Sequence, residues 1–269
     1  MHTIIPHSAR QLAFRVSSLA GYWCSAQSHL YIHAPFAFQL VKDVIYDEQP
    51  HAEYNNLLSL RHAQLNDRSP LSFAPAGALA NGHMIENNVA QIARRYALPV
   101  KHAKLLLRLV KFLKPRTILE TGTGTGFSAA ALALGNSNAA VYTVDAVQQL
   151  SDLARRHHRD AGIANVRYAV GDLDAALVDM AKKITPIDFV YLDANHTREA
   201  TLRYFEGLLP HLSPNACIAV DDIHWSSGMK KAWLELTRRD SVSLSIDLFR
   251  LGLLFFNPGL NREALRVYF

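Results

Sequence analysis

The sequence predicts an α/β fold: a doubly wound, mostly parallel sheet of seven strands that ends in an antiparallel strand. Two observations support this. Between residues 117 and 236, short apolar segments alternate with amphipathic segments of helical period, a pattern typical of parallel strands covered by helices on both faces. Val242–Phe249 and Leu251–Phe256 then follow each other with no room for a helix between them. Because a parallel crossover needs about a dozen residues, we expect these last two strands to be antiparallel.

The alternation assigns the other elements in order. Five buried strands are expected at Thr117–Glu120, Ala140–Asp145, Val166–Val170, Ile187–Leu192 and Ala216–Val220. The helices that connect or follow them are expected at Phe127–Leu134, Val147–Ala161, Leu173–Lys183, Arg198–Leu212 and Met229–Leu236. Glycines that end two of these helices, and short apolar runs that are too brief for helices, support this division.

The region before residue 117 is expected to be helical, with one interruption. Residues 1–65 carry helical spacing, and Ala34-Pro35-Phe36 is typical of a helix start. Residues 66–82 are polar and rich in proline, glycine and asparagine, which predicts a linker. Helix signals resume near Met84. We therefore divide the chain into a helical N-terminal extension with its linker, residues 1–82, and a main domain, residues 83–269.

The composition is that of an ordinary globular protein. Of 269 residues, 49% are hydrophobic and 19% charged, which argues against global disorder. The net charge is +5, and many of the basic residues occur as short, separated pairs. We therefore expect these pairs to lie on solvated helix faces and not to form a nucleic-acid-binding surface. Two cysteines without a paired motif, no membrane-spanning stretch and no signal-peptide pattern lead us to expect a cytoplasmic protein with no membrane insertion.

The strongest motif is the glycine-rich segment from Glu120 to Gly126, Glu-Thr-Gly-Thr-Gly-Thr-Gly. It follows a predicted strand and opens a predicted helix, where glycine allows a sharp turn and a close approach to a ligand. Asp145 ends the next strand, where a carboxylate can accept hydrogen bonds from both ribose hydroxyls. The GxGxG spacing differs from the GxGxxG of dinucleotide sites. A nucleoside-containing ligand other than a dinucleotide is therefore favoured.

From Glu120 to Phe256 the sequence resembles the class I, Rossmann-like methyltransferases that use S-adenosylmethionine (SAM). In that family the glycine loop lines the methionine portion of SAM, and the preceding acid supports the loop and the amino group. Acids after the next two strands contact ribose and adenine. The resemblance implies a cofactor site formed by Glu120, Gly122, Thr123, Gly124, Gly126, Ser128, Asp145, Ala146, Gly171, Asp172 and Asp193.

Two further segments resemble the catechol-type O-methyltransferases: Asp188–His196 and Val220–Asp222. Such enzymes often hold a divalent cation after the fourth and fifth strands. The resemblance implies Asp193, Asp221 and Asp222 as ligands of Mg²⁺ or another divalent cation, which suits oxygen donors. Where catechol-type enzymes have Asp-Asn, this chain has two acids, and the extra negative charge favours a metal or another cationic partner.

His196 stands where the catechol-type enzymes have a lysine base. Histidine can deprotonate a hydroxyl near neutral pH. His224 lies on the loop after the fifth strand, so it is a second candidate base or acceptor contact, and a capping histidine is an equal alternative. We predict Asp193, His196 and His224 as the catalytic residues. Ile32–Phe38 and Asp221–Trp225 are also similar to uncharacterised bacterial class I methyltransferases with a helical N-terminal extension.

The sequence therefore predicts a SAM-dependent methyltransferase acting on a small-molecule acceptor, at oxygen. RNA or protein methylation is an alternative, although the Asn/Asp-Pro-Pro-aromatic segment typical of base amino-methyltransferases is replaced by Asp193-Ala-Asn-His196. A nicotinamide-dependent oxidoreductase and a non-catalytic SAM-binding protein are further alternatives. We do not expect a nucleic-acid partner, and whether the chain forms a homodimer stays open.

Overall fold

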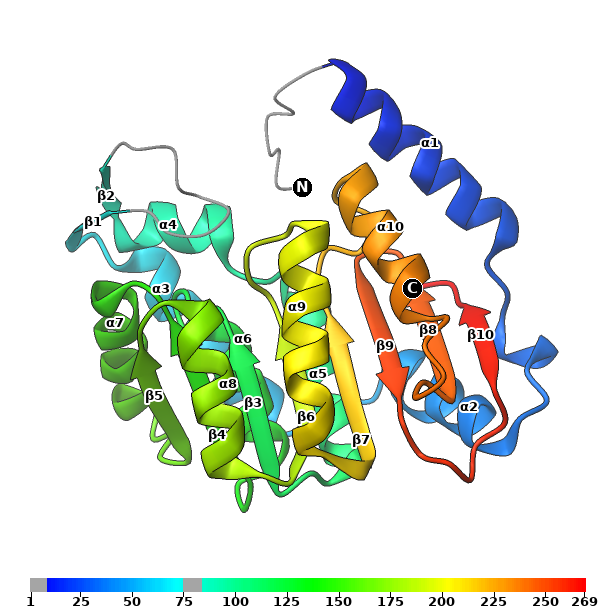
Figure 1. Ribbon diagram of the computed structural model, residues 1–269. Coiled ribbons are helices and arrows are strands. Elements are labelled where there is room, and N and C mark those ends of the chain that lie inside the picture. The colour runs from blue at the N-terminus through cyan, green and yellow to red at the C-terminus, as the bar shows by residue number, and fades with distance from the viewer. Residues whose placement is uncertain (1–8, 75–83) are drawn as a thin grey trace. The chain divides into compact units, whose positions relative to one another are not determined.

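The computed structural model describes residues 9–74 and 84–269 (Figure 1). By their internal contacts these residues form two compact units. Unit 1 contains the described part of residues 49–187, and unit 2 contains residues 9–48 and 188–269. The division at residue 82 stays a prediction. The linker assigned to residues 66–82 lies partly outside the described residues.

Unit 1 contains three parallel strands, β3 (Thr117–Thr121), β4 (Ala140–Asp145) and β5 (Val166–Val170). β4 lies between the other two. Four helices accompany them: α5 (Val100–Leu113), α6 (Phe127–Gly135), α7 (Gln148–Asp160) and α8 (Leu173–Ile184). Figure 1 shows α8 in front of these strands and α6 behind them. Because the three strands are parallel, their carboxyl ends lie at the same edge, where the glycine loop follows β3 and Asp145 ends β4.

The rest of unit 1 precedes the strands. It comprises α3 (Glu53–Asn66), β1 (Pro70–Phe73), β2 (Ile85–Asn88) and α4 (Val89–Tyr96). β1 and β2 form an antiparallel pair, so the prediction of a plain linker is wrong for residues 70–73. Phe73 is buried against Ile92, Val147 and Leu150. This apolar contact explains why residues 70–73 form a strand. The helix expected near Met84 begins at Val89, after a capping box formed by Asn88 and Gln91.

Unit 2 contains the remaining strands, whose order is β10-β8-β9-β7-β6. Their bounds are β6 (Ile187–Leu192), β7 (Leu212–Val220), β8 (Leu244–Leu248), β9 (Leu251–Phe255) and β10 (Glu263–Arg266). β9 is antiparallel to both β7 and β8, which confirms the predicted antiparallel ending. β10 pairs in parallel with β8 and was not predicted.

Two helices of unit 2, α9 (Arg198–Leu208) and α10 (Ser227–Leu236), follow β6 and β7. A short 3₁₀ turn, Leu209–His211, ends the segment that we expected to be a single helix. The N-terminal part of the unit is helical, as predicted: α1 (Ala9–Ser25), a 3₁₀ turn (His29–Tyr31), α2 (Pro35–Leu40) and a π-helical turn (Val41–Ile45). Pro35 occupies the first turn of α2, where its missing N–H costs no hydrogen bond.

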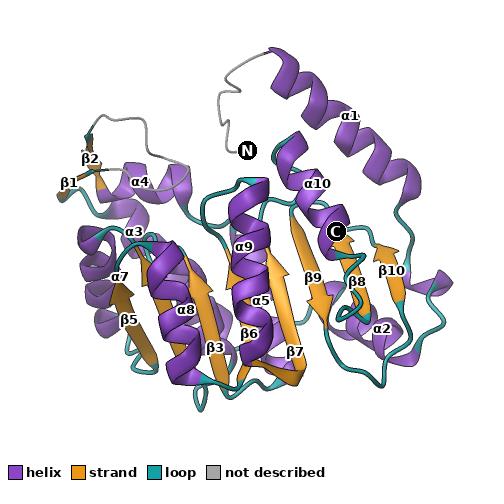
Figure 2. Cartoon of the chain, in the orientation of Figure 1, coloured by secondary structure: helices purple, strands orange, loops and turns teal. Residues whose placement is uncertain are grey.

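The predicted fold class is confirmed. The chain is an α/β protein with a mostly parallel set of strands, flanking helices and N-terminal helices (Figure 2). The core strands β8 and β9 are buried along their whole length, as expected for strands covered on both faces. Among the described residues, no helix is both long enough and apolar enough to cross a membrane.

Candidate functional site

The glycine loop between β3 and α6 has the backbone that its sequence requires. Gly122, Gly124 and Gly126 all have positive φ, at 85°, 51° and 83°. At Gly126 the space is also closed, because a Cβ there would lie 2.7 Å from both the Cβ of Ala154 and Nε2 of His158. Only glycine meets both demands. The turn therefore leads directly into the N-terminus of α6, with Gly126 as the N-cap residue.

Asp145, at the end of β4, fastens this loop. Its Oδ2 accepts a hydrogen bond from the Gly124 N–H at 2.9 Å, and its Oδ1 accepts one from the Val147 N–H at 2.8 Å. Burial raises the pKa of Asp145, and the backbone hydrogen bonds oppose that rise. The backbone N–H groups of Thr123 and Ala146 also act on this carboxylate. The sequence predicted Asp145 as a ribose ligand; the structure adds that it also holds the glycine loop.

Glu120 is completely buried at the end of β3. Its Oε2 accepts a hydrogen bond from the Thr143 hydroxyl at 2.6 Å, whereas Oε1 has no hydrogen-bond partner among the described residues. Burial raises the pKa of Glu120 to about 8, although the Ser128 and Thr143 hydroxyls act to lower it. A buried carboxylate oxygen without a partner is costly, and a cationic ligand group would satisfy it. The cofactor amino group predicted at this position fits that need.

Other elements of unit 1 hold the loop from outside, and sequence reasoning missed them. Gln64 of α3 donates from Nε2 to the Thr125 carbonyl at 2.7 Å. His158 of α7 donates from Nε2 to the Gly126 carbonyl at 2.7 Å, and its Nδ1 lies 2.5 Å from the Tyr168 hydroxyl. Burial lowers the pKa of His158 to about 4, so the ring is neutral at physiological pH. These partners are far apart in sequence, so no local motif could indicate them.

The remaining predicted cofactor residues of unit 1 lie at the same strand ends. The hydroxyls of Thr123 and Thr143 are 2.7 Å apart, and Ser128 is buried in the first turn of α6. The Gly171 N–H donates to the Asp145 carbonyl at 3.0 Å, joining the ends of β5 and β4. Ala146, between Asp145 and Val147, is half-buried. Asp172 caps α8, its Oδ1 accepting from the N–H groups of residues 174 and 175.

Asp193 and His196 follow β6 in unit 2. Oδ1 of Asp193 lies 3.5 Å from Nε2 of His196, and about a fifth of each side chain is exposed. Asn195 and His196 both have positive φ, at 63° and 25°. Such conformations are strained in non-glycine residues and often occur at functional loops. The structure thus brings two of the predicted catalytic residues together on a half-buried, tightly turned loop.

A hollow of about 530 Å³ lies beside this loop. The N-terminal turns of α9 and α10 form it, capped by Thr197 and Ser226, whose hydroxyls accept from backbone N–H groups. Arg198 and Glu235 join the two helices through a bidentate pair at 2.9 and 2.8 Å. The hollow is lined by His196, Thr197, Arg198, Glu199, Ser226, Ser227, Gly228, Lys231 and Glu235. It can accommodate a small polar molecule beside an imidazole.

Asp221 and Asp222, after β7, have a partner that the sequence did not identify. Arg250 donates from Nε and Nη2 to the two oxygens of Asp221 at 3.0 and 2.8 Å, and its Nη2 lies 3.4 Å from Oδ1 of Asp222. Burial alone would lower the pKa of Arg250, but the two carboxylates raise it. Burial and the Asp221 charge raise the pKa of Asp222. Across residues 9–74 and 84–269, no group of three metal-binding side chains is assembled. The residues present therefore do not fit the predicted divalent-cation site.

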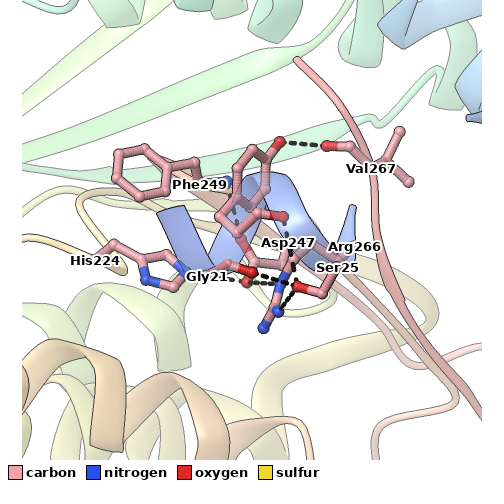
Figure 3. A network of polar contacts seen from close by, with 8 residues as sticks. Gly21, Ser25, His224, Asp247, Phe249, Arg266 and Val267 are labelled. Atoms are coloured by element: carbon pink, nitrogen blue, oxygen red, sulfur yellow. Dashed lines mark hydrogen bonds and ion pairs between the residues drawn. The ribbon is translucent and has the colours of Figure 1, made fainter. Parts of the chain in front are cut away.

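His224 is buried rather than exposed on its loop. Its Nε2 lies 3.0 Å from Oδ2 of Asp247 on β8, and its ring stacks on Phe249 at 5.0 Å (Figure 3). Asp247 also accepts from the Phe249 N–H and from Nε of Arg266 on β10. Burial would raise the pKa of Asp247, but its hydrogen bonds and the charges of His224 and Arg266 lower it. The sequence hinted at Asp247 only as the one acid within an apolar strand.

The same network ties the chain ends to this carboxylate. Arg266 donates to the Ser25 hydroxyl at the end of α1 (Figure 3). The Tyr22 hydroxyl donates to the Val267 carbonyl. Burial, as the largest cause, raises the pKa of Tyr22, so the phenol stays protonated. The N-terminal helix is therefore fixed to the strand that carries Asp247.

Comparisons with known proteins give matches to methyltransferases. Residues 119–223 match a family model described as a methyltransferase domain. The chain is 38% identical over 78 residues to a protein-L-isoaspartate O-methyltransferase of Methanococcoides burtonii, covering 29% of this chain and 38% of that protein. It is 28% identical over 174 residues to a catechol O-methyltransferase of Mycobacterium tuberculosis, covering 64% and 74%. The chain thus spans well under half of the first relative.

Among solved structures, an O-methyltransferase from Bacillus cereus in complex with S-adenosylhomocysteine (SAH) has a similar fold. Its TM-score is 0.53 at 22% identity, with 81% of this chain and 94% of that chain covered. The order of strands and helices, the glycine loop and these similarities agree. Residues 119–223 therefore match a methyltransferase domain, and the chain has the Rossmann-like α/β fold of a solved O-methyltransferase.

Proposed function

We propose that this chain transfers the methyl group of SAM to an oxygen atom of a small-molecule acceptor. The observation that carries the proposal is the arrangement at the ends of β3 and β4. There a glycine loop with three positive φ angles is bonded to Asp145, beside a buried Glu120 whose Oε1 has no partner among the described residues. When bound, SAM supplies a methyl carbon attached to a positively charged sulfur. The named relatives, which are O-methyltransferases, support oxygen as the target.

The residues of unit 1 hold the cofactor. The Glu120 carboxylate binds its amino group, and the N–H groups of the loop and of the first turn of α6 favour its carboxylate. The Asp145 carboxylate would accept hydrogen bonds from the ribose hydroxyls. Asp172 would contact the adenine through Oδ2, because Oδ1 is the atom that caps α8. Asp145 and His158 keep the loop in place for this purpose.

The residues of unit 2 bind and activate the acceptor. We assign the acceptor to the hollow formed by the N-terminal turns of α9 and α10. His196 removes the proton from the acceptor hydroxyl, and Asp193, 3.5 Å away, stabilises the imidazolium that results. Methyl transfer is an in-line displacement, so orientation of the acceptor oxygen supplies much of the remaining catalysis. No step of this proposal uses a metal ion.

His224 is the second candidate base. Asp247 accepts a hydrogen bond from the Nε2–H group of His224, so the lone pair of the ring is on Nδ1. Nδ1 has no hydrogen-bond partner among the described residues. The side chain is only 4% exposed, so an acceptor reaches it only if the loop after β7 moves. The greater exposure of His196 favours His196 as the group that touches the acceptor.

Protein carboxyl methylation is a second candidate function. Several relatives are protein-L-isoaspartate O-methyltransferases, although each match covers a short part of this chain. A peptide containing L-isoaspartate, incubated with SAM, distinguishes the two functions. Methylation of that peptide in preference to hydroxyl-bearing small molecules would favour the second.

The test of the proposed function is calorimetric titration of the purified chain with SAH and, separately, with NADH. We expect SAH to bind in a one-to-one ratio and NADH not to bind. Asp145→Asn is the informative variant, because Asp145→Ala would also release the loop from β4. We expect weaker SAH binding by Asp145→Asn, and a smaller loss of thermal stability than in Asp145→Ala, because the amide oxygen can keep one of the two backbone hydrogen bonds. Failure of the wild type to bind SAH would refute the proposal. SAH binding without turnover in a broad acceptor screen would leave only a SAM-binding protein.

A further inference from the structure

The two acids after β7 already have a cation. Both oxygens of Asp221 accept hydrogen bonds from the Arg250 guanidinium, and the Asp221 side chain is completely buried. A bidentate guanidinium–carboxylate pair is among the strongest polar contacts in proteins. A divalent cation could bind Asp221 only by displacing this guanidinium and leaving it without its main counter-charge.

The backbone fixes Arg250 at this position. The Ile223 N–H donates to the Arg250 carbonyl at 3.1 Å, joining the loop after β7 to the turn between β8 and β9. The residues just before Ile223 and Arg250, Asp222 and Phe249, have positive φ of 53° and 67°. Bulky residues keep such conformations only where the surrounding structure enforces them. Arg250 is therefore held in place by the main chain of two connected turns as well as by its ion pairs.

The charges around Arg250 are balanced without a metal. Asp222 lies 3.4 Å from the same Nη2 atom, and the positive charge of Arg15 also acts on Asp222. Asp193 lies beside His196. Asp221 and Asp222 thus share a cationic side chain within unit 2, and an imidazole lies beside Asp193.

We infer that the guanidinium of Arg250 takes the place of the divalent cation, and that this chain needs no metal to bind or orient its acceptor. This inference rests on the proposed function. The Nη1 atom of Arg250 donates none of the hydrogen bonds of its ion pairs, and 28% of the side chain is exposed. The planar guanidinium pairs with the Asp221 carboxylate in a fixed bidentate geometry that a lysine could not reproduce.

Manganese titration followed by electron paramagnetic resonance tests the inference without an acceptor, because bound Mn²⁺ loses its sharp signal. We expect the wild type, with SAH present, to leave the Mn²⁺ signal unchanged. Arg250→Met frees the oxygens of Asp221 and Asp222, and we expect it to bind Mn²⁺ at least about tenfold more tightly than the wild type. The double variant Arg250→Met/Asp221→Asn should lose that gain. Arg250→Gln, which keeps a neutral donor for Asp221, replaces the Met variant if the latter does not fold.

Arg262→Met is the matched control, since Arg262 pairs with the exposed Asp240 in the same unit. It should behave as the wild type does. Stoichiometric Mn²⁺ binding by the wild type that Asp221→Asn abolishes would overturn the inference. A folded Arg250→Met or Arg250→Gln that gains no Mn²⁺ affinity would overturn it too. If the wild type does not bind SAH, the proposed function is refuted instead. Failure of the proposed function and failure of this inference are therefore distinguishable.

Discussion

Nε2 of His224 lies 3.0 Å from Oδ2 of Asp247, and both side chains are 4% exposed. The two residues are 23 positions apart, one on the loop after β7 and the other on β8. The same Oδ2 also accepts from Arg266 at 3.1 Å. A buried carboxylate thus holds the loop after β7, the C-terminal strand and, through Arg266, the N-terminal helix.

Asp247→Asn should lower the free energy of unfolding by about 3–5 kcal/mol, because it removes one member of a buried, hydrogen-bonded charge network. Urea denaturation at neutral pH measures this. The folded pKa of Asp247 lies below its ordinary value of 3.8. Its stabilisation is therefore complete above about pH 4 and is lost as pH falls through the folded pKa. The gap between wild type and variant should close in that acidic range. Asp240→Asn, at a fully exposed ion pair, is the control and should change nothing measurable.

Glu120→Gln should stabilise the chain without ligand in alkaline solution. The pKa of Glu120 is about 8 in the folded state, against 4.5 as its ordinary value. Between these pH values the unfolded chain releases the proton and the folded chain keeps it, so the wild type loses stability as pH rises. The glutamine variant has no such loss. Melting temperatures at pH 5 and pH 8 measure the effect, and a difference independent of pH would contradict it.

The same variant should weaken SAH binding. A hydrogen bond to a charged group is worth about 1.5–3 kcal/mol, which corresponds to a loss of about tenfold or more. Because Glu120 must lose its proton to pair with an ammonium group, binding to the wild type should release a proton below pH 8. Calorimetry in two buffers of different ionisation enthalpy measures that release. Equal heats in both buffers would argue against Glu120 as the partner of the amino group.

Gly126→Ala should disrupt the glycine loop. The new Cβ would lie 2.7 Å from the Ala154 Cβ, and the alanine backbone would have to adopt a positive φ. We therefore expect the free energy of unfolding to fall by about 2–4 kcal/mol. We also expect SAH binding to be lost. Gly162→Ala separates the two causes, because Gly162 has a φ of 71° with nothing near the added Cβ. It should cost about 1 kcal/mol and leave SAH binding intact. Similar losses for both variants would mean that strain alone matters.

His196→Gln and His224→Gln distinguish the two candidate bases. We expect His196→Gln to lower kcat by roughly 10²–10⁴-fold, the range typical of a general base, with little effect on the melting temperature. His224→Gln should lower the melting temperature first, since its ring is stacked and bonded in the interior. The measurement is SAH release with any acceptor that the wild type methylates. A larger loss of kcat in a fully stable His224→Gln would transfer the role of base to His224.

The sequence alone was sufficient for elements whose signal is local. The five predicted parallel-type strands and their helices appear within a few residues of the expected bounds, because buried strands and amphipathic helices have their own hydrophobic periods. The short interval between Val242–Phe249 and Leu251–Phe256 correctly predicted an antiparallel pair. β10 was not predicted because it has four residues, of which only Leu265 is buried. β1 escaped because its proline and polar residues are typical of a loop, while Phe73 orders it through a distant contact.

The sequence by itself determined that a glycine loop would join a strand to a helix, with Asp145 at the end of the next strand. Those residues are set by backbone φ and by their place at strand ends. Only the tertiary structure decided which cation pairs with Asp221, which acid holds His224, and that Gln64 supports the loop. These partners are 23 to 61 positions apart, and the register of β7, β8 and β9 brings the first two pairs together. Charge pairing between distant elements depends on that register, and no local spacing encodes it.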